Sequence, residues 1–188
     1  MTHPAADSYT VLESRVVFEG QLSSVNVDTV RMPDGHETER EIVVHPSAVA
    51  IVAIDDDEQV VLLQQYRHPV RDVMLELPAG KLDTDGESRE ETARRELAEE
   101  VGLAAGELIE LVTFHNSSGW TDEDTTVYLA TDLREVAAPH GFSPEAEEAH
   151  MQVMRMPLAQ AVDRARRGEV TDAKTLIGLL LAAQRLGR

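Results

Sequence analysis

The sequence from Arg95 to Leu103 reads Arg-Glu-Leu-Ala-Glu-Glu-Val-Gly-Leu, and it says more about this chain than any other stretch. On a helix, Glu96, Glu99 and Glu100 stand at positions i, i+3 and i+4, so their three carboxylates share one face. Like charges at this spacing destabilise a helix by roughly 0.2–0.5 kcal/mol per pair. A hard cation such as Mg²⁺, which takes oxygen ligands, would turn the repulsion into coordination. The alternative interpretation is an exposed acidic helix in an acidic protein.

A strand and a loop lead into this helix. Val73 to Leu77 is apolar enough for a buried strand, and a loop containing proline and glycine follows it. The helix is expected to begin near Glu87 or Ser88 and to end at Gly102, because glycine suits the left-handed position after a helix. This order predicts a loop, a helix and a second loop, with backbone carbonyls of the first loop able to face the carboxylates.

These residues resemble the Nudix box, G-x5-E-x7-R-E-U-x-E-E-x-G-U, in which U is a bulky aliphatic residue. The matching positions are Gly80, Glu87, Arg95, Glu96, Leu97, Glu99, Glu100, Gly102 and Leu103. One departure is visible, because six residues rather than five separate the first glycine from the first glutamate. An extra loop residue costs little free energy, and the helical half of the pattern has no gap.

Three further segments look like the ADP-ribose pyrophosphatase branch of the Nudix hydrolases: His45 to Ala50, Gln65 to Val70, and Glu76 to Gly80. The resemblance implies an α/β fold with a mixed sheet, arranged as an α/β/α Nudix sandwich. It also implies a small N-terminal antiparallel β-domain at residues 1–45 and a Nudix hydrolase domain at residues 46–188. In this branch the N-terminal domain is often exchanged or shared across a homodimer, so a homodimer is implied here.

The resemblance implies which residues hold the metal ion. Glu96 and Glu100 are the first implied ligands, followed by Glu99 and the carbonyl of Ala79. Mg²⁺ is the implied cofactor, with Mn²⁺ as the alternative ion. A diphosphate carries closely spaced negative charges, and metal ions held by carboxylates neutralise them and activate water.

Three other residues receive roles from the same resemblance. Arg95, placed with Glu99 among the catalytic residues, would pair with Glu99 or brace the loop through Glu87. Arg67 would hold a phosphate or the terminal ribose, since its planar fork suits phosphate oxygens. Glu76 would contact metal or ribose. The alternative for Arg67 is a surface salt bridge.

The general base is expected outside the box, on a loop that closes over the substrate in related enzymes. The candidate loop runs from Gly141 to His150 and contains Glu148, Glu147 and Glu145, in that order of preference. The alternative is a solvated acidic loop. A Glu148→Gln variant should lose turnover by ~10²-fold or more, which is the range for a lost general base; turnover equal to wild type would rule out this assignment.

The segment from Asn116 to Glu123 bears on the substrate. ADP-ribose-preferring relatives usually carry a proline and a glycine after the box, followed by an aromatic residue and an acidic pair. Gly119, Trp120, Asp122 and Glu123 match this pattern, but Ser118 stands where proline is expected. Gly119 and Trp120 are the substrate-binding residues that the resemblance implies here. Trp120 would stack on an adenine or pack in the core. The departure at Ser118 leaves other substrates open: a GDP-sugar, a dinucleotide coenzyme such as NADH, or FAD.

Composition narrows the function further. The chain has 188 residues, no cysteine and a formal net charge of −18, and 42% of its residues are hydrophobic. Without cysteine there is no disulfide, thiolate zinc site or cysteine nucleophile. The negative charge argues against binding nucleic acid or an anionic membrane. No apolar stretch has the length of a membrane span, so the protein is expected in the cytoplasm. The partner that the resemblance implies is a small-molecule nucleoside diphosphate substrate.

Two functional classes remain. The first is a Mg²⁺-dependent hydrolase of a nucleoside diphosphate derivative, with ADP-ribose as the leading substrate and AMP and ribose 5-phosphate as products. The second is a non-catalytic nucleotide sensor with the same fold. Such sensors lose box carboxylates or carry an added DNA-binding domain, whereas this chain keeps every box glutamate. The pattern therefore favours the enzyme.

Overall fold

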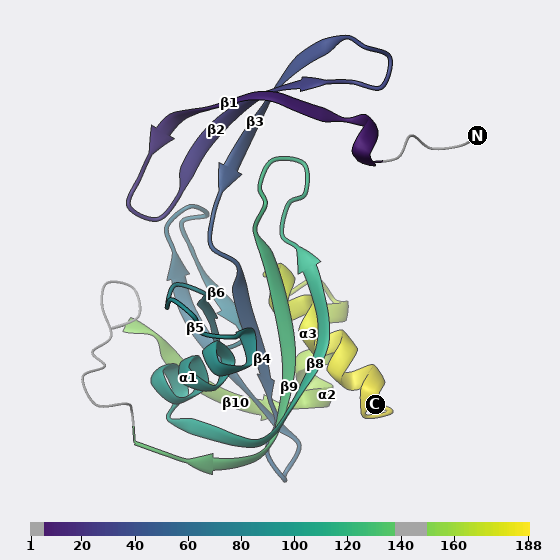
Figure 1. The fold of residues 1–188 in the computed structure, drawn as a ribbon. Helices are drawn as coiled ribbons and strands as arrows, with labels where there is room; N and C mark the ends of the chain where they lie inside the picture. The colour runs from purple at the N-terminus through teal and green to yellow at the C-terminus, as the bar shows by residue number, and fades with distance from the viewer. Residues whose placement is uncertain (1–5, 138–149) are drawn as a thin grey trace. The chain divides into compact units, whose positions relative to one another are not determined.

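The computed structural model describes residues 6–137 and 150–188 (Figure 1). The chain divides into two compact units, the first comprising Met1–Pro46 with His115–Asp124 and the second comprising Ser47–Phe114 with Thr125–Arg188. No described helix has the length and apolar character that a membrane crossing requires.

The first unit contains a three-stranded antiparallel sheet. A short 3₁₀ helix precedes it, and its elements are η1 (Ala6–Ser8), β1 (Thr10–Glu19), β2 (Ser24–Arg31) and β3 (Glu37–Val44). The strands pair in the order β1-β2-β3. Gly35 closes the β2–β3 turn with a φ of 91°, a conformation that glycine adopts without steric cost. The predicted N-terminal antiparallel sheet is thus confirmed.

The second unit contains two sheets and three helices. Its elements are β4 (Ala48–Ala53), β5 (Gln59–Arg67), β6 (Asp72–Glu76), β7 (Ala79–Lys81), α1 (Arg89–Val101), β8 (Leu103–His115), β9 (Asp124–Glu135), β10 (Gln152–Pro157), α2 (Leu158–Arg166) and α3 (Ala173–Arg185). One sheet has the order β7-β4-β9-β8, and β4 and β9 within it are parallel; the other has the order β10-β5-β6. The mixed sheet agrees with the predicted fold class.

The mixed sheet is covered by helices on both faces (Figure 1). Side chains of β4 alternate between them: Val49 and Ile51 pack in a cluster with α1, and Ala50 and Val52 pack in a cluster with α2 and α3. Because both faces are buried, β4 is apolar throughout, as central strands of such sheets are. The result is the predicted α/β/α sandwich.

From the sequence, residues 48–54 and 59–65 are expected to pair with each other as a hairpin. This prediction is wrong, because the two strands do not pair along their length. The turn exists, since Asp55 N–H donates to Gln59 O at 3.1 Å, but pairing stops at the isolated bridge of Ile54 with Val60. Beyond the bridge the strands enter different sheets, because β7 and β9 occupy both edges of β4 while β10 and β6 occupy both edges of β5.

Helix α1 begins and ends where the sequence predicts. Ser88 is its N-cap and forms a capping box with Glu91, which satisfies two amide groups at the helix start. Gly102 ends it with a φ of 65°, in the left-handed region. The two caps therefore fix the first and last residues of α1, which carries the glutamates beside the loop before β7.

Candidate active site

The loop between β6 and β7 is held by three neighbouring elements of the second unit. Leu77 N–H donates to Thr175 Oγ1 of α3 at 2.8 Å, and the Pro78 carbonyl accepts from an amide of β4 at 2.8 Å. Ala79 N–H donates to Glu100 Oε2 of α1 at 2.9 Å. The contact recorded at Ala79 thus involves its N–H, whereas the sequence reading assigns its carbonyl to the metal. The loop backbone is fixed directly beside the carboxylate face of α1.

Arg95 lies at the centre of that face. Its Nε and Nη2 donate to Glu87 at 3.1–3.2 Å, and its Nη1 donates to Glu96 at 2.6 Å and to Glu99 at 2.9 Å. Both alternatives for Arg95, pairing with Glu99 and bracing Glu87, therefore occur together. Burial opposes its charge, but these carboxylates outweigh burial and raise the pKa of Arg95.

Glu96 packs directly against Gly80. A Cβ atom at Gly80 would lie 1.9 Å from Glu96 Cδ, so glycine is needed for the carboxylate to occupy this position. Burial raises the pKa of Glu96, and the charges of Glu99 and Asp83 add to the rise, while Arg95 opposes it. The ionised Glu96 is thus left incompletely compensated by Arg95.

The donor chemistry of this face fits a divalent cation. Within residues 6–137 and 150–188, no group of three acidic or histidine side chains is already gathered as a ligand set. Glu96 and Glu99 nevertheless converge on one cationic atom, Arg95 Nη1. Carboxylate oxygens are the ligands that Mg²⁺ takes, and Glu100 lies one residue further on the same helix.

A second charged cluster lies where β5, β6 and α3 meet. Glu76 is 1% exposed and accepts two hydrogen bonds of 2.7 Å from Arg67, one from Nε and one from Nη2. Lys174 Nζ also donates to Glu76 and, at 2.9 Å, to Asp172. Burial would raise the pKa of Glu76, but Arg67 and Lys174 outweigh it and lower that pKa. Arg67 therefore does form a salt bridge, as the alternative interpretation expects, and its own side chain is 41% exposed, but the partner carboxylate is buried.

Sequence reasoning missed Lys174 and Asp172 as members of this cluster. Asp172 caps α3 by accepting from Thr175 N–H at 3.0 Å, a role that aspartate commonly has at a helix start. The pairing of Lys174 with Glu76 spans 98 residues of chain, so no local pattern indicates it.

The remaining predicted residues lie elsewhere. Gly119 and Trp120 belong to the first unit, where Trp120 O accepts from Val43 N–H at 2.8 Å. The Trp120 side chain is 57% exposed, which excludes the core alternative and leaves its ring available for stacking. Glu145, Glu147 and Glu148 lie outside the described residues.

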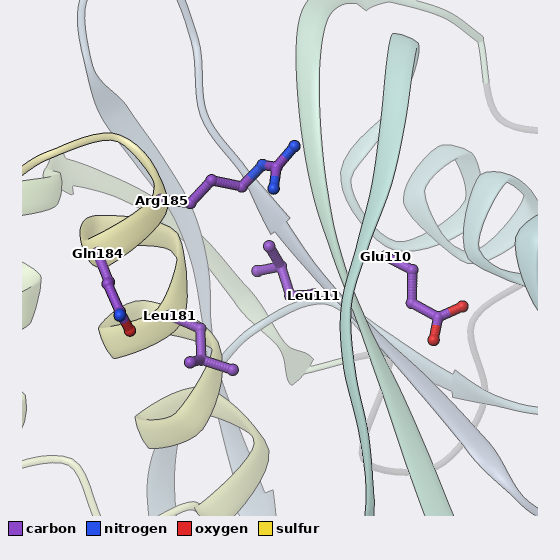
Figure 2. Close-up of a pocket in the computed structure, with 5 residues that line it drawn as sticks. All are labelled: Glu110, Leu111, Leu181, Gln184 and Arg185. Carbon is purple, nitrogen blue, oxygen red and sulfur yellow. The ribbon is translucent and has the colours of Figure 1, made fainter.

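A surface pocket of the second unit is separate from these clusters. Its lining residues belong to β8 and α3 and are labelled in Figure 2: Glu110, Leu111, Leu181, Gln184 and Arg185. Leu111 packs with the core cluster on the α3 face of the mixed sheet, whereas α1 packs on the other face. The pocket contains none of the predicted site residues.

Comparisons with known proteins find similar proteins over most of this chain. A sequence model of the NUDIX domain matches residues 44–177, and one of the nucleoside diphosphate sugar hydrolase N-terminal domain matches residues 9–43. The chain is 42% identical to the ADP-ribose pyrophosphatase of Mycobacterium tuberculosis (94% of this chain, 84% of that protein). It is 37% identical to the ADP-ribose pyrophosphatase of Bacillus subtilis (85% of this chain, 84% of that protein). A crystal structure of an ADP compounds hydrolase matches with a TM-score of 0.81 and 27% identity, over 95% of this chain and 94% of that one.

Proposed function

The chain belongs to the Nudix family of hydrolases, and from that premise we propose that it cleaves the diphosphate of ADP-ribose into AMP and ribose 5-phosphate. The observation that carries the proposal is the α1 face, where Glu96 and Glu99 converge on Arg95 beside the loop at Gly80. Relatives named ADP-ribose pyrophosphatase support the choice of substrate.

We propose Mg²⁺ as the cofactor, with Mn²⁺ as the alternative ion, held by Glu96, Glu99 and Glu100 and by the carbonyl of Ala79. Hard carboxylate oxygens favour these ions over softer metals. The bound cation would polarise phosphoryl oxygens and activate water. The face supplies the negative charge for this, since its carboxylates outnumber Arg95.

The other roles follow from the chemistry of each side chain. Arg95 keeps Glu87 and the glutamate face in place through its hydrogen bonds. Arg67, oriented by Glu76, would hold a phosphate or ribose of the substrate. We assign general-base catalysis to Glu148, with Glu147 as the next choice, and substrate stacking to Trp120 next to Gly119.

A panel of nucleoside diphosphate derivatives tests the proposal. The full chain is incubated with Mg²⁺ or Mn²⁺ and ADP-ribose, a GDP-sugar, NADH or FAD, and the products are separated by chromatography. We expect AMP and ribose 5-phosphate from ADP-ribose at the highest kcat/KM. Faster hydrolysis of another compound would make that compound the preferred substrate instead of ADP-ribose, an outcome that the serine at position 118 leaves open. Tight binding without hydrolysis of any compound would indicate a sensor.

We propose that the first unit forms a homodimer contact. All of β1 is exposed at the edge of its sheet, including Val16 at 60% and Phe18 at 57%. An exposed apolar edge strand is a template for pairing, and proteins rarely leave one uncovered. We assign the covering partner to a second copy, because residues 9–43 match a domain of nucleotide-sugar hydrolases and comprise this sheet.

Light scattering of the full chain tests the dimer. The wild type should have the mass of two chains, and Val16→Lys should have the mass of one. Val153→Lys changes an exposed valine of β10 in the second unit and is the matched control. A wild type that is monomeric at all concentrations would contradict this proposal while leaving the hydrolase proposal intact.

We also propose that the protein works in the cytoplasm. Its fold needs no oxidising compartment, because the chain has no cysteine, and nucleoside diphosphate derivatives are produced there. Fractionation of cells that carry a tagged full chain should find it with the cytoplasmic markers. Recovery with an extracellular fraction would contradict the placement.

A further inference from the structure

We propose that Lys174 is a positioning residue: by holding Glu76 from α3, it fixes the Arg67 guanidinium in the orientation that binds the phosphate or ribose of the substrate. This inference rests on the proposed function, because it needs a substrate anion at Arg67. Lys174 itself contacts neither substrate nor metal in this proposal.

The hydrogen bonds leave one edge of Arg67 open. Its Nε donates to Glu76 Oε1 and its Nη2 donates to Glu76 Oε2, so this edge of the guanidinium is occupied. Among the described residues, Nη1 has no recorded partner, and the side chain is 41% exposed. Since an arginine carries five N–H donors in a fixed plane, locking one edge on Glu76 determines where the open edge points.

Lys174 determines how Glu76 itself is oriented. Its Nζ donates to Oε2, the same oxygen that accepts from Arg67 Nη2. A carboxylate held from β5 and from α3 cannot turn about its terminal bond without breaking one of these contacts. With Lys174 removed, Arg67 would be the sole cation on a carboxylate that is almost completely buried, and the plane of the pair would be free to rotate.

The anchor of Lys174 is rigid. Asp172 accepts from Lys174 Nζ through Oδ1 and caps α3 through Oδ2, which accepts from Thr175 N–H and Oγ1–H. Thr175 Oγ1 accepts from Leu77 N–H in turn. The lysine is therefore tied to the helix start that also fixes the loop beside the carboxylates of α1.

Arg67 lies within the electrostatic reach of that carboxylate face. The hydrogen bonds that Arg67 donates to Glu76 raise the pKa of Arg67 against the effect of burial, and the charges of Asp172 and Glu100 add to the rise. The chain geometry also connects the two regions. Glu76, the partner of Arg67, directly precedes the loop in which Leu77 N–H donates to Thr175 of α3 and Ala79 N–H donates to Glu100 of α1. A substrate anion at Arg67 would therefore lie beside the loop that borders the carboxylates we assign to the metal.

Steady-state kinetics with ADP-ribose and Mg²⁺ separate positioning from stability. The variants are Lys174→Met, Lys174→Gln, Lys174→Arg, Arg67→Met and the double variant Lys174→Met with Arg67→Met. Arg164→Met breaks an ion pair of α2 with Glu169 and is the control. Thermal unfolding of each variant is followed in parallel, so that a loss of fold is seen directly.

We expect Lys174→Met and Lys174→Gln to raise KM by about 10-fold with little change in kcat, the magnitude of losing an orienting partner and the pattern of lost substrate binding. Lys174→Arg should restore most of the affinity, because it keeps a donor and a charge. In the Arg67→Met background, Lys174→Met should add almost nothing to KM, since the group it positions is gone.

Three results would overturn the inference. One is a KM for both Lys174→Met and Lys174→Gln that equals that of Arg164→Met. Another is the same increase in KM whether or not Arg67 is present. The third is a KM that Lys174→Arg does not restore although the variant is folded. A wild type that hydrolyses no nucleoside diphosphate derivative is a different outcome, because it overturns the proposed function itself.

Discussion

The second unit contains two charged clusters that are built from the same residue types and balanced differently. The first, which we call the Arg95 cluster, sets one arginine against four carboxylates: Asp83, Glu87, Glu96 and Glu99. The second, the Glu76 cluster, sets two cations against two carboxylates: Arg67 and Lys174 against Glu76 and Asp172. The excess negative charge of the Arg95 cluster favours binding of a divalent cation. In the Glu76 cluster the charges balance, and the ion pairs orient the four side chains relative to one another.

The pKa shifts express the same difference. Glu96 and Glu76 are both enclosed, yet burial dominates at Glu96 and raises its pKa, while Arg67 and Lys174 overcome burial at Glu76 and lower its pKa. Burial alone therefore does not decide the direction of the pKa shift. The neighbouring charges decide it: two cations lower the pKa of Glu76, whereas Glu99 and Asp83 add to burial at Glu96 and Arg95 alone opposes them.

The largest expected effect is the loss of activity on removing a ligand from the Arg95 cluster. Glu96→Gln keeps the shape of the side chain and removes its charge, so turnover with Mg²⁺ should fall by more than about 100-fold, beyond the loss typical of residues that only orient a metal ligand. The Mg²⁺-dependent rise in Tm should vanish as well. Glu90→Gln, on the same helix but paired with Arg94, is the control and should behave as wild type. Full activity of Glu96→Gln would contradict the assignment of Glu96 as a metal ligand.

The next effect is a contrast in stability, measured by urea unfolding in EDTA. At neutral pH, Glu76→Gln should lose about 3 kcal/mol, because it leaves cations beside a buried site; this is the low end for a broken buried pair, since Arg67 is partly exposed. Glu96→Gln should instead be more stable than wild type, because the ionised Glu96 is insufficiently compensated. The same sign for both variants would contradict the comparison.

The pH dependence follows from the direction of each shift. The stability that the lowered pKa of Glu76 provides is present above the unfolded value of about 4.3 and is lost as pH falls through the lower folded pKa. The raised pKa of Glu96 acts the other way: its favourable contribution is complete below about 4.3 and is lost as pH rises through the folded pKa. The advantage of Glu96→Gln over wild type should consequently disappear on acidification.

A smaller effect is expected from Gly80→Ala. The new Cβ would displace the Glu96 carboxylate, which is the flexible end of its side chain, so the helix and strands need not move. We expect the affinity for Mn²⁺, measured by calorimetry, to fall by about 10-fold, with Tm in EDTA unchanged. An unchanged affinity would mean that the position of Glu96 against Gly80 does not matter for the metal.

The smallest expected effect distinguishes the stability of helix α1 from the function of the carboxylates on it. Ser88→Ala removes the N-cap of α1 and should cost about 1 kcal/mol of unfolding free energy. Because the side chain of Ser88 pairs with Glu91 and not with the carboxylates around Arg95, KM and Mn²⁺ affinity should remain at wild-type values. A tenfold loss of affinity in this variant would show that helix stability, not charge balance, limits metal binding.

The residues of α1 were predictable because their information is local. The helical period places Glu96, Glu99 and Glu100 on one face, and Ser88 and Gly102 mark the two ends, whatever the rest of the chain does. The pairing of β4 was not predictable in the same way. An apolar run shows that a strand is buried but not which strands border it. The expected hairpin is therefore absent: β4 pairs with β7 and β9, and β5 pairs with β10 and β6.

By itself, the sequence determined the chemistry of the Arg95 cluster, because all of its members lie within one loop and one helix. Only the tertiary structure decided the Glu76 cluster, since Lys174 reaches Glu76 across 98 residues and the contact exists because α3 packs beside β6. Charges far apart in sequence meet only after apolar packing has positioned the elements that carry them. The balance of charge around Glu76 is therefore a property of the fold.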